Sequence, residues 1–176
     1  MSQRIKTGLT GALLLTSLTV AAQQNPPDVT GKWQLQNADQ TQATLEVAVN
    51  KVAKEMNFFI RALAKPVLRE QTQICDQWQL DWQKAQFQWQ CDDTETEVVP
   101  MIAQGEKIKT DDEGVDIFAT YQHTADSVVV ILTSERGKRT NTWQRLNDQR
   151  LLYTAKLESE KLPTPLTWSL NYRRVP

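Results

Sequence analysis

Cys75 and Cys91 are the two cysteines of this chain, and their neighbours limit the chemistry open to them. A thiolate nucleophile needs a nearby cation that lowers the thiol pKa, whereas the acids Asp76, Asp92 and Asp93 flank the cysteines. A metal site would need partner ligands. The pattern therefore predicts a structural Cys75–Cys91 disulfide, worth on the order of 3 kcal/mol for a loop of this size.

Catalytic chemistry has little support elsewhere in the chain. His123 is the only histidine, which excludes a multi-histidine metal site, and no Gly-x-Ser-x-Gly element supports a serine triad. Acids gather in segments 92–97 and 110–114, where calcium is an alternative to solvated turns, but the ordered spacing of a calcium loop is missing. We expect no catalytic, cofactor-binding or metal-ligating residues and no enzyme activity; His123 as a general base is the minor alternative.

Large aromatic side chains are the other group able to build a site. The six tryptophans are Trp33, Trp78, Trp82, Trp89, Trp143 and Trp168. They could line a pocket for a small apolar ligand inside a curled sheet, or simply form its core. If a pocket exists, we expect Trp82, Trp89 and Trp168 to contact the ligand.

Residues 1–22 have the pattern of a secretory signal peptide. Arg4 and Lys6 precede an uncharged apolar run, and small residues lead to a predicted cleavage between Ala22 and Gln23. The run is too short for a stable membrane span, and no nearby cysteine offers a lipid acceptor. We expect a periplasmic or secreted protein that is soluble after cleavage and has no stable membrane anchor.

The remaining chain has the size of one domain. Residues 23–28 read as a flexible lead-in and residues 29–176 as a single β domain. Loss of Arg4 and Lys6 changes the formal charge from −1 to −3, which argues against nucleic acid as a partner.

Apolar periodicity predicts the elements of this domain. A period of two marks a strand at 29–35, a hairpin at 74–91 and further strands to the C-terminus. A helical period predicts one amphipathic helix at about 41–64, capped by Asp39 with Gln42, ended or kinked at Pro66, with Phe59 and Leu63 in its core stripe.

The hairpin has a register that constrains the disulfide. Aligned apolar faces place Trp82 opposite Phe87 and Trp78 opposite Cys91, so Cys75 is out of register. A Cys75–Cys91 bridge therefore requires a bulge or a break next to Cys75. Together the elements predict a mainly β protein with one long helix, an antiparallel barrel of about eight strands or a strongly curled sheet packed on that helix.

The first and last strands carry a family resemblance. Gly31-Lys32-Trp33 followed by an up-and-down strand pattern that ends in a basic residue resembles the lipocalin and calycin barrels. The resemblance implies that Trp33 plugs one end of the barrel and that Arg174 lies across its indole, worth ~1 kcal/mol. Segments 57–61, 137–141 and 162–166 are also similar to a group of exported bacterial proteins of unassigned function.

Two functions follow as hypotheses. The first is an exported soluble binding protein for a small hydrophobic or lipid-like ligand, with no cofactor. The second is an envelope interaction or assembly protein without a small-molecule ligand, which exposed aromatics on the Trp78–Trp89 hairpin would favour. A void of several hundred cubic ångströms inside the sheet would support the first, and a packed interior the second.

Overall fold

The computed structural model describes residues 27–72 and 74–176. The predicted signal, its cleavage site at Ala22 and Gln23, and residues 23–26 of the lead-in lie outside the described residues. Within them, the elements are β1 (Gly31–Leu35), α1 (Ala38–Lys54), α2 (Phe58–Gln71), β2 (Gln77–Gln83), β3 (Gln86–Cys91), β4 (Glu97–Pro100), β5 (Gln104–Thr110), β6 (Asp116–His123), β7 (Ser127–Ser134), β8 (Gly137–Asn147), β9 (Arg150–Glu158) and β10 (Leu166–Val175).

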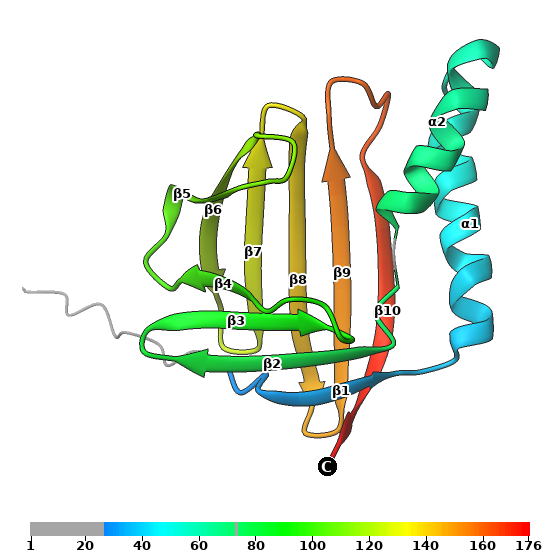
Figure 1. Ribbon diagram of the computed structural model, residues 1–176. Coiled ribbons are helices and arrows are strands. Elements are labelled where there is room, and N and C mark those ends of the chain that lie inside the picture. Colours follow the sequence, from blue (N-terminus) through cyan, green and yellow to red (C-terminus); the bar gives the residue numbers. More distant parts are fainter. Residues whose placement is uncertain (1–26, 73) are drawn as a thin grey trace, which may run out of the picture.

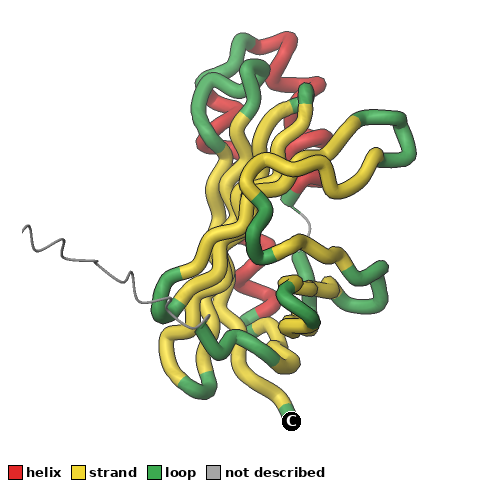
Figure 2. Tube along the Cα trace, turned by 90° about the vertical axis from the view of Figure 1, so that its left-hand side faces the viewer, coloured by secondary structure: helices red, strands yellow, loops and turns green. Residues whose placement is uncertain are grey.

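All ten strands form one antiparallel sheet in the order β4-β3-β2-β1-β10-β9-β8-β7-β6-β5. The sheet curls so that β1 to β4 cross the lower part of the long strands β7 to β10 (Figure 1), and the side view shows the two layers that result (Figure 2). Near the free edges, the Tyr121 backbone N–H donates to the Ala103 carbonyl at 2.9 Å. The prediction of a mainly β antiparallel barrel is confirmed, as a nearly closed barrel.

The predicted number of about eight strands is wrong, because the described residues contain ten. The strand that the sequence did not reveal is β5. Its residues are exposed except for a half-buried Ile108, and its pairing with β6 shifts register twice. An edge strand with little apolar burial carries no alternation for a sequence pattern to detect.

The single predicted helix is also wrong, because two helices connect β1 to β2. The helix is interrupted after Lys54. Arg61 stabilises this break between α1 and α2 by donating to the carbonyls of Ala53 at 2.9 Å, Lys54 at 2.8 Å and Met56 at 3.0 Å. Asn57 caps α2 by accepting the Ile60 backbone N–H at 3.0 Å.

Neither end of the predicted helix lies where the pattern put it. Pro66 does not end α2, which continues to Gln71; Ala62, whose carbonyl loses its helical partner, is exposed to water. At the start of α1 the N-cap residue is Asn37, with a left-handed φ of 56° and no side-chain cap hydrogen bond. Because α1 begins at Ala38, Asp39 lies inside the helix and not at the predicted cap position, and its side chain is outside the described part of the structure.

The break also changes which apolar residues are buried. Leu45, Val49 and Val52 of α1 pack in the core. Phe59 and Leu63 belong to the same sequence stripe but are exposed, so their prediction as core is wrong. When a second helix begins after a break, its apolar side chains point in a different direction from those of the first helix. A sequence pattern that treats the two as one helix cannot detect this change.

The β2–β3 hairpin has the predicted register, with Trp82 opposite Phe87 and Trp78 opposite Cys91. The Cys75–Cys91 disulfide is confirmed, with Cα atoms 5.3 Å apart. Cys75 lies before the first residue of β2, so the ladder ends as the bridge requires. The Asp92 carboxylate accepts the backbone N–H groups of Asp76 at 3.2 Å and Gln77 at 2.7 Å, which satisfies the donors at this break.

Candidate functional site

Aromatic side chains fill the part of the barrel that β1 to β3 cross. Trp143 lies at the centre of this cluster, fully buried, with ring centroids of its neighbours 5.3 to 5.6 Å away. Those neighbours are Trp78, Phe87, Trp89 and Tyr153. We call these five residues the aromatic cluster; it leaves this half of the interior packed.

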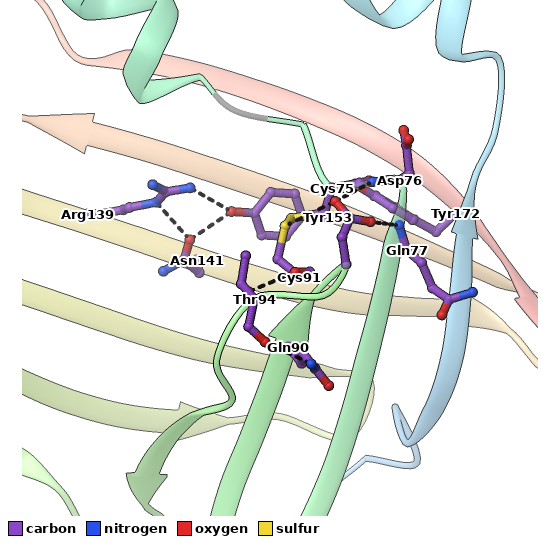
Figure 3. Close-up of a disulfide and its surroundings, with 11 residues drawn as sticks. Cys75, Asp76, Gln77, Gln90, Cys91, Thr94, Arg139, Asn141, Tyr153 and Tyr172 are labelled. Atoms are coloured by element: carbon purple, nitrogen blue, oxygen red, sulfur yellow. Dashed lines mark hydrogen bonds between the residues drawn. A yellow bond between two sulfur atoms is a disulfide. The ribbon is translucent and has the colours of Figure 1, made fainter.

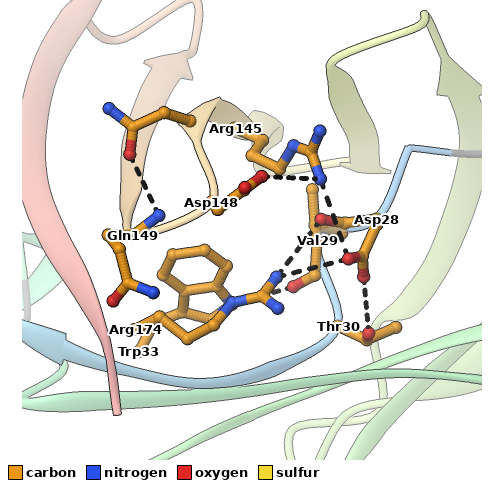
Figure 4. A network of polar contacts seen from close by, with 9 residues as sticks. Asp28, Val29, Thr30, Trp33, Arg145, Asp148, Gln149 and Arg174 are labelled. Atoms are coloured by element: carbon orange, nitrogen blue, oxygen red, sulfur yellow. Dashed lines mark hydrogen bonds and ion pairs between the residues drawn. The ribbon is translucent and has the colours of Figure 1, made fainter.

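The barrel end below the cluster is closed by Trp33. Its ring is fully buried, its Nε1 donates to the Val29 carbonyl at 2.8 Å, and the Arg174 guanidinium lies 4.7 Å from its ring centroid. Figure 4 shows Arg174 and Arg145 converging on Asp28, at 3.6 and 3.7 Å. A hydrogen bond from Thr30, then the charges of Arg174 and Arg145, lower the pKa of Asp28. Trp33 and Arg174 thus make the contact that the resemblance implies.

The opposite end of the barrel holds a cavity of about 530 Å³. Residues from the end of α2, the β5–β6 connection, the β7–β8 hairpin and the β9–β10 connection surround it. Its apolar wall consists of Val67, Leu68, Ile117, Leu132, Leu157 and Leu162. At its rim Gly137 has a φ of 142°, and a Cβ there would lie 2.4 Å from the Glu158 carbonyl oxygen, so this turn requires glycine.

Basic side chains outnumber acids around this cavity. The lining includes Lys109, Arg136, Lys138, Arg139 and Lys161, against the acids Asp111 and Glu158. Three of the cations form ion pairs: Lys109 with Glu97, Arg136 with Glu113 at 2.5 Å, and Lys138 with Glu158 at 2.9 Å. These pairs lie at the exposed rim, where they contribute little to stability.

Arg139 differs from the rim cations because it shares the inward face of β8 with buried Asn141 and Trp143. Its Nε donates to Asn141 Oδ1 at 3.1 Å, and its NH2 group lies 3.4 Å from the Tyr153 hydroxyl, which itself donates to Asn141 Oδ1 at 2.8 Å. Figure 3 shows these three side chains turned toward one another. Among residues 27–72 and 74–176, Arg139 has polar partners that are neutral and no carboxylate.

Tyr153 is neutral in this arrangement. Burial raises the pKa of its hydroxyl, and the charge of Arg139 beside it acts in the opposite direction. A neutral phenol donates to Asn141 and provides Arg139 with no counter-charge.

The disulfide stands beside this group (Figure 3). The Tyr172 hydroxyl donates to the Cys75 carbonyl at 2.8 Å, and its ring centroid lies 6.5 Å from that of Tyr153. The Cys75–Cys91 bridge therefore fixes the start of β2 and the end of β3 next to the Arg139, Asn141 and Tyr153 side chains.

The residues predicted to bind a ligand lie away from the cavity lining. Trp89 is buried in the aromatic cluster, and Trp82 is half-buried, 4.7 Å from the Phe87 ring. Trp168 lies nearest, with the Arg139 guanidinium 5.7 Å from its ring centroid. Ligand contact by these three tryptophans stays a prediction; the cavity itself is lined by other residues.

Sequence reasoning did not identify Arg139 or Leu132. Arg139 alternates in step with Asn141 and Trp143 along one strand, and an arginine on the inward parity of a strand is a signal that could have been noticed. Leu132 lies in a continuous apolar run whose inward members cannot be distinguished by alternation.

The remaining polar candidates show local structural contacts. Asp111 accepts the backbone N–H groups of Glu113 and Val115, which orders the turn at 110–114. Within the described part of the chain, the group of possible metal-ligand side chains is Cys75, Cys91 and Asp92, but the two sulfurs are bonded to each other. The ring of His123 packs 5.7 Å from that of Tyr121.

Exposed aromatics do not occur where the interaction hypothesis expected them. Trp78 and Trp89 of the hairpin are buried; the exposed aromatics are Phe58 and Phe59 at the start of α2 and Phe118 on β6. Neither helix in the described residues has the length and hydrophobicity needed to cross a membrane.

No family model and no curated protein matches this chain. A solved SAHS (secretory abundant heat soluble) protein of Ramazzottius varieornatus is similar with a TM-score of 0.51, at 15% identity, over 86% of this chain and 98% of its own. The likeness is one of fold. It agrees with the barrel that the lipocalin and calycin resemblance implied; the likeness to exported bacterial proteins stays an expectation.

Two further solved structures have lower scores. REP1-NXSQ fatty acid transporter has a TM-score of 0.49 at 13% identity, over 85% of this chain and 97% of its own. Secretory abundant heat soluble protein 4 of Ramazzottius varieornatus has a TM-score of 0.47 at 15% identity, over 84% of this chain and 94% of its own.

Proposed function

We propose that this chain is an exported soluble protein that binds a small, lipid-like ligand with an apolar body and an anionic head. The observation that carries the proposal is the cavity of about 530 Å³ at one end of the barrel, with leucine-rich walls and Arg139 among its lining residues.

The size and walls of the cavity suit a single amphiphile. Pockets for small ligands span about 300 to 1,000 Å³ and are mainly apolar with a few polar groups that fix orientation. Transfer of an apolar chain from water contributes about 25 cal/mol for each Å² buried. Such a surface is supplied by Ile117 of β6, Leu132 of β7 and Leu157 of β9.

Arg139 supports the choice of an anionic head. A guanidinium that is partly buried among neutral partners loses hydration without gaining a counter-charge, and an anion placed beside it restores that interaction. The geometry of a guanidinium suits a carboxylate or a phosphate. Lys138 and Lys161 at the rim would favour the approach of the same charge.

The carboxylates at the cavity favour binding over catalysis. Glu158 accepts hydrogen bonds from Lys156 and Lys138, which lower its pKa. Asp111 holds backbone N–H groups of its own turn. A general base needs a pKa near the working pH, so Glu158 is not suited to proton transfer.

Native mass spectrometry of the protein purified from the envelope of its host tests the proposal. We expect a co-purifying mass of lipid size. Leu132→Trp places an indole in the cavity and should abolish this mass, whereas Ile131→Trp, on the opposite face of β7, should retain it. An apo mass from the wild-type protein would contradict the proposal.

Export has its own test. The mass of the purified protein should begin at Gln23 if the predicted signal is cleaved after Ala22. An intact N-terminus in the host would overturn this part of the proposal and leave ligand binding untouched.

The second candidate function, an envelope interaction protein without a small ligand, has one observation in its favour. Apolar side chains of α2 are exposed to solvent. Crosslinking that traps one dominant protein partner, together with an apo mass, would support it.

A further inference from the structure

The solvent face of α2 is apolar. The exposed fraction is 74% for Phe58, 80% for Phe59 and 78% for Leu63, and Ile60 and Val67 are also exposed. We call these five residues the α2 face. Scattered exposed leucines are ordinary, but five large apolar side chains within ten residues form a contiguous patch that marks an interaction surface.

The α2 face has a defined geometry. Phe59, Leu63 and Val67 follow one another at spacings of four, so they form one stripe along the helix. The Phe58 and Phe59 rings lie 5.7 Å apart, edge to face. Leu68 is buried and lies outside this stripe. Val67, at the end of the stripe, also lines the cavity, whereas Phe59 and Leu63 lie outside the cavity lining.

The fold holds the α2 face in place. Arg61 ties the first turn of α2 to the end of α1 through three carbonyls, and Arg69 pairs with Glu46 of α1 at 2.6 Å. The aromatic tip is therefore presented by a braced helix pair, which stands at the edge of the barrel beside β10 (Figure 1).

The charge around this tip is positive. Residues 51–65 contain Lys51, Lys54, Arg61 and Lys65 against the single acid Glu55, whereas the whole chain has a formal charge of −1. Lys51 and Lys54 are exposed at the end of α1. Charges act over about 8 to 10 Å at physiological salt, so the local sign decides what approaches this tip.

We propose that the α2 face and its lysines dock reversibly on an anionic phospholipid surface. Aromatic and leucine side chains on one helix face, flanked by lysines whose long stems reach a charged headgroup layer, are the features of a helix that lies in a membrane interface. A protein partner would match the apolar face, but a surface that is both apolar and uniformly anionic matches the lysines as well. The acidic balance of the remaining chain keeps such docking reversible.

This inference goes beyond ligand binding and does not depend on it. It does join the two sites in space, because Val67 of the α2 face and Leu68 of the same helix line the cavity.

Vesicle flotation of the exported, ligand-free protein tests the proposal. Vesicles of phosphatidylcholine and phosphatidylglycerol at equal parts should bind the protein, pure phosphatidylcholine vesicles should bind it weakly, and a rise to about 0.5 M salt should release it. Phe58→Ser with Phe59→Ser should weaken binding by roughly tenfold or more. Lys54→Gln should weaken it about fivefold.

Matched controls use equally exposed residues elsewhere. Ile102→Ser removes an apolar side chain that is 78% exposed between β4 and β5, and Lys32→Gln removes a cation from the outer face of β1; neither should change flotation. Equal binding by the Phe variant, no vesicle binding by the wild type, or self-association that is lost only in the Phe variant would each overturn the proposal. Unchanged thermal unfolding of the variants excludes misfolding as the cause.

Discussion

Each end of this barrel has an arginine over a tryptophan ring, and the two ends differ in the polar partners of that arginine. At one end Arg174 lies over Trp33 and meets the carboxylate of Asp28. At the other, Arg139 lies over Trp168 and meets an amide and a phenol. The first end, which we call the closed end, is packed and charge-balanced. The second, which we call the open end, contains the cavity and has the positive charge of Arg139 among its lining residues.

Under the proposed function, this difference separates the half of the sheet that stabilises the fold from the half that binds a ligand. The aromatic cluster provides buried contact area, so the half of the barrel that contains it can fold around its own side chains. The half that carries Leu132, Leu157 and Arg139 gives up contact area and charge compensation, which a ligand can then supply.

A matched pair of leucine truncations should give the largest difference between the ends. Leu151→Ala opens a void in a fully buried site and should lower the free energy of unfolding by about 3 kcal/mol. Leu132→Ala enlarges a cavity that already exists and should cost about 1 kcal/mol. Urea unfolding of both variants measures the two costs; equal losses would show that the open end is as tightly packed as the closed one.

Removal of the disulfide should affect the base of the β2–β3 hairpin first. Cys75→Ala with Cys91→Ala should lower the free energy of unfolding by about 3 kcal/mol, because the unfolded chain regains the freedom of the loop between them. Hydrogen exchange should accelerate at the start of β2 and the end of β3 more than in β9. Uniform acceleration over all strands would contradict a local bracing role.

The two arginines offer a test of charge balance. Arg174→Gln should cost about 1 kcal/mol, since it removes the cation from Trp33 and from Asp28. Arg139→Gln should leave the stability of the ligand-free protein within about 0.5 kcal/mol, because no carboxylate is left behind in the described structure. Thermal unfolding measures both, and a larger loss for Arg139→Gln would reverse the comparison.

Protonation of Asp28 at low pH should give the smallest loss of stability among these tests. The pKa of Asp28 is lower in the folded protein, so its contribution to stability is present above its unfolded pKa of about 3.9 and is lost as pH falls through the folded value. Asp28 is more than half exposed, and solvent screening limits the effect to a few tenths of a kcal/mol. Asp28→Asn should therefore narrow the gap in stability between pH 7 and pH 3. An unchanged gap would show that other carboxyls account for it.

The sequence predicted the parts of the molecule in which local pattern and tertiary burial agree. Alternation along the hairpin gave the register of Trp78 with Cys91, and with it the position of the disulfide. It failed at β5, which buries little, and at Phe59 and Leu63, because a break before α2 turns their stripe toward solvent.

The cavity could not be predicted for a different reason. Its lining comes from α2, from each of the strands β5 to β9 and from the loops between them, so no single segment carries its pattern. Tryptophans marked the aromatic core instead, and the inward arginine at 139 was overlooked because cations on strands are ordinarily exposed.

Selectivity for ligand charge measures whether Arg139 selects an anionic head. Titration calorimetry with dodecanoate and with dodecyltrimethylammonium compares an anionic and a cationic head on the same apolar chain. We expect the wild-type protein and the control Arg173→Met, on the outer face of β10, to prefer dodecanoate by about tenfold or more, and Arg139→Met to lose that preference while still binding the chain. Equal affinity of the wild-type protein for both probes, or an unchanged preference in Arg139→Met, would contradict the account.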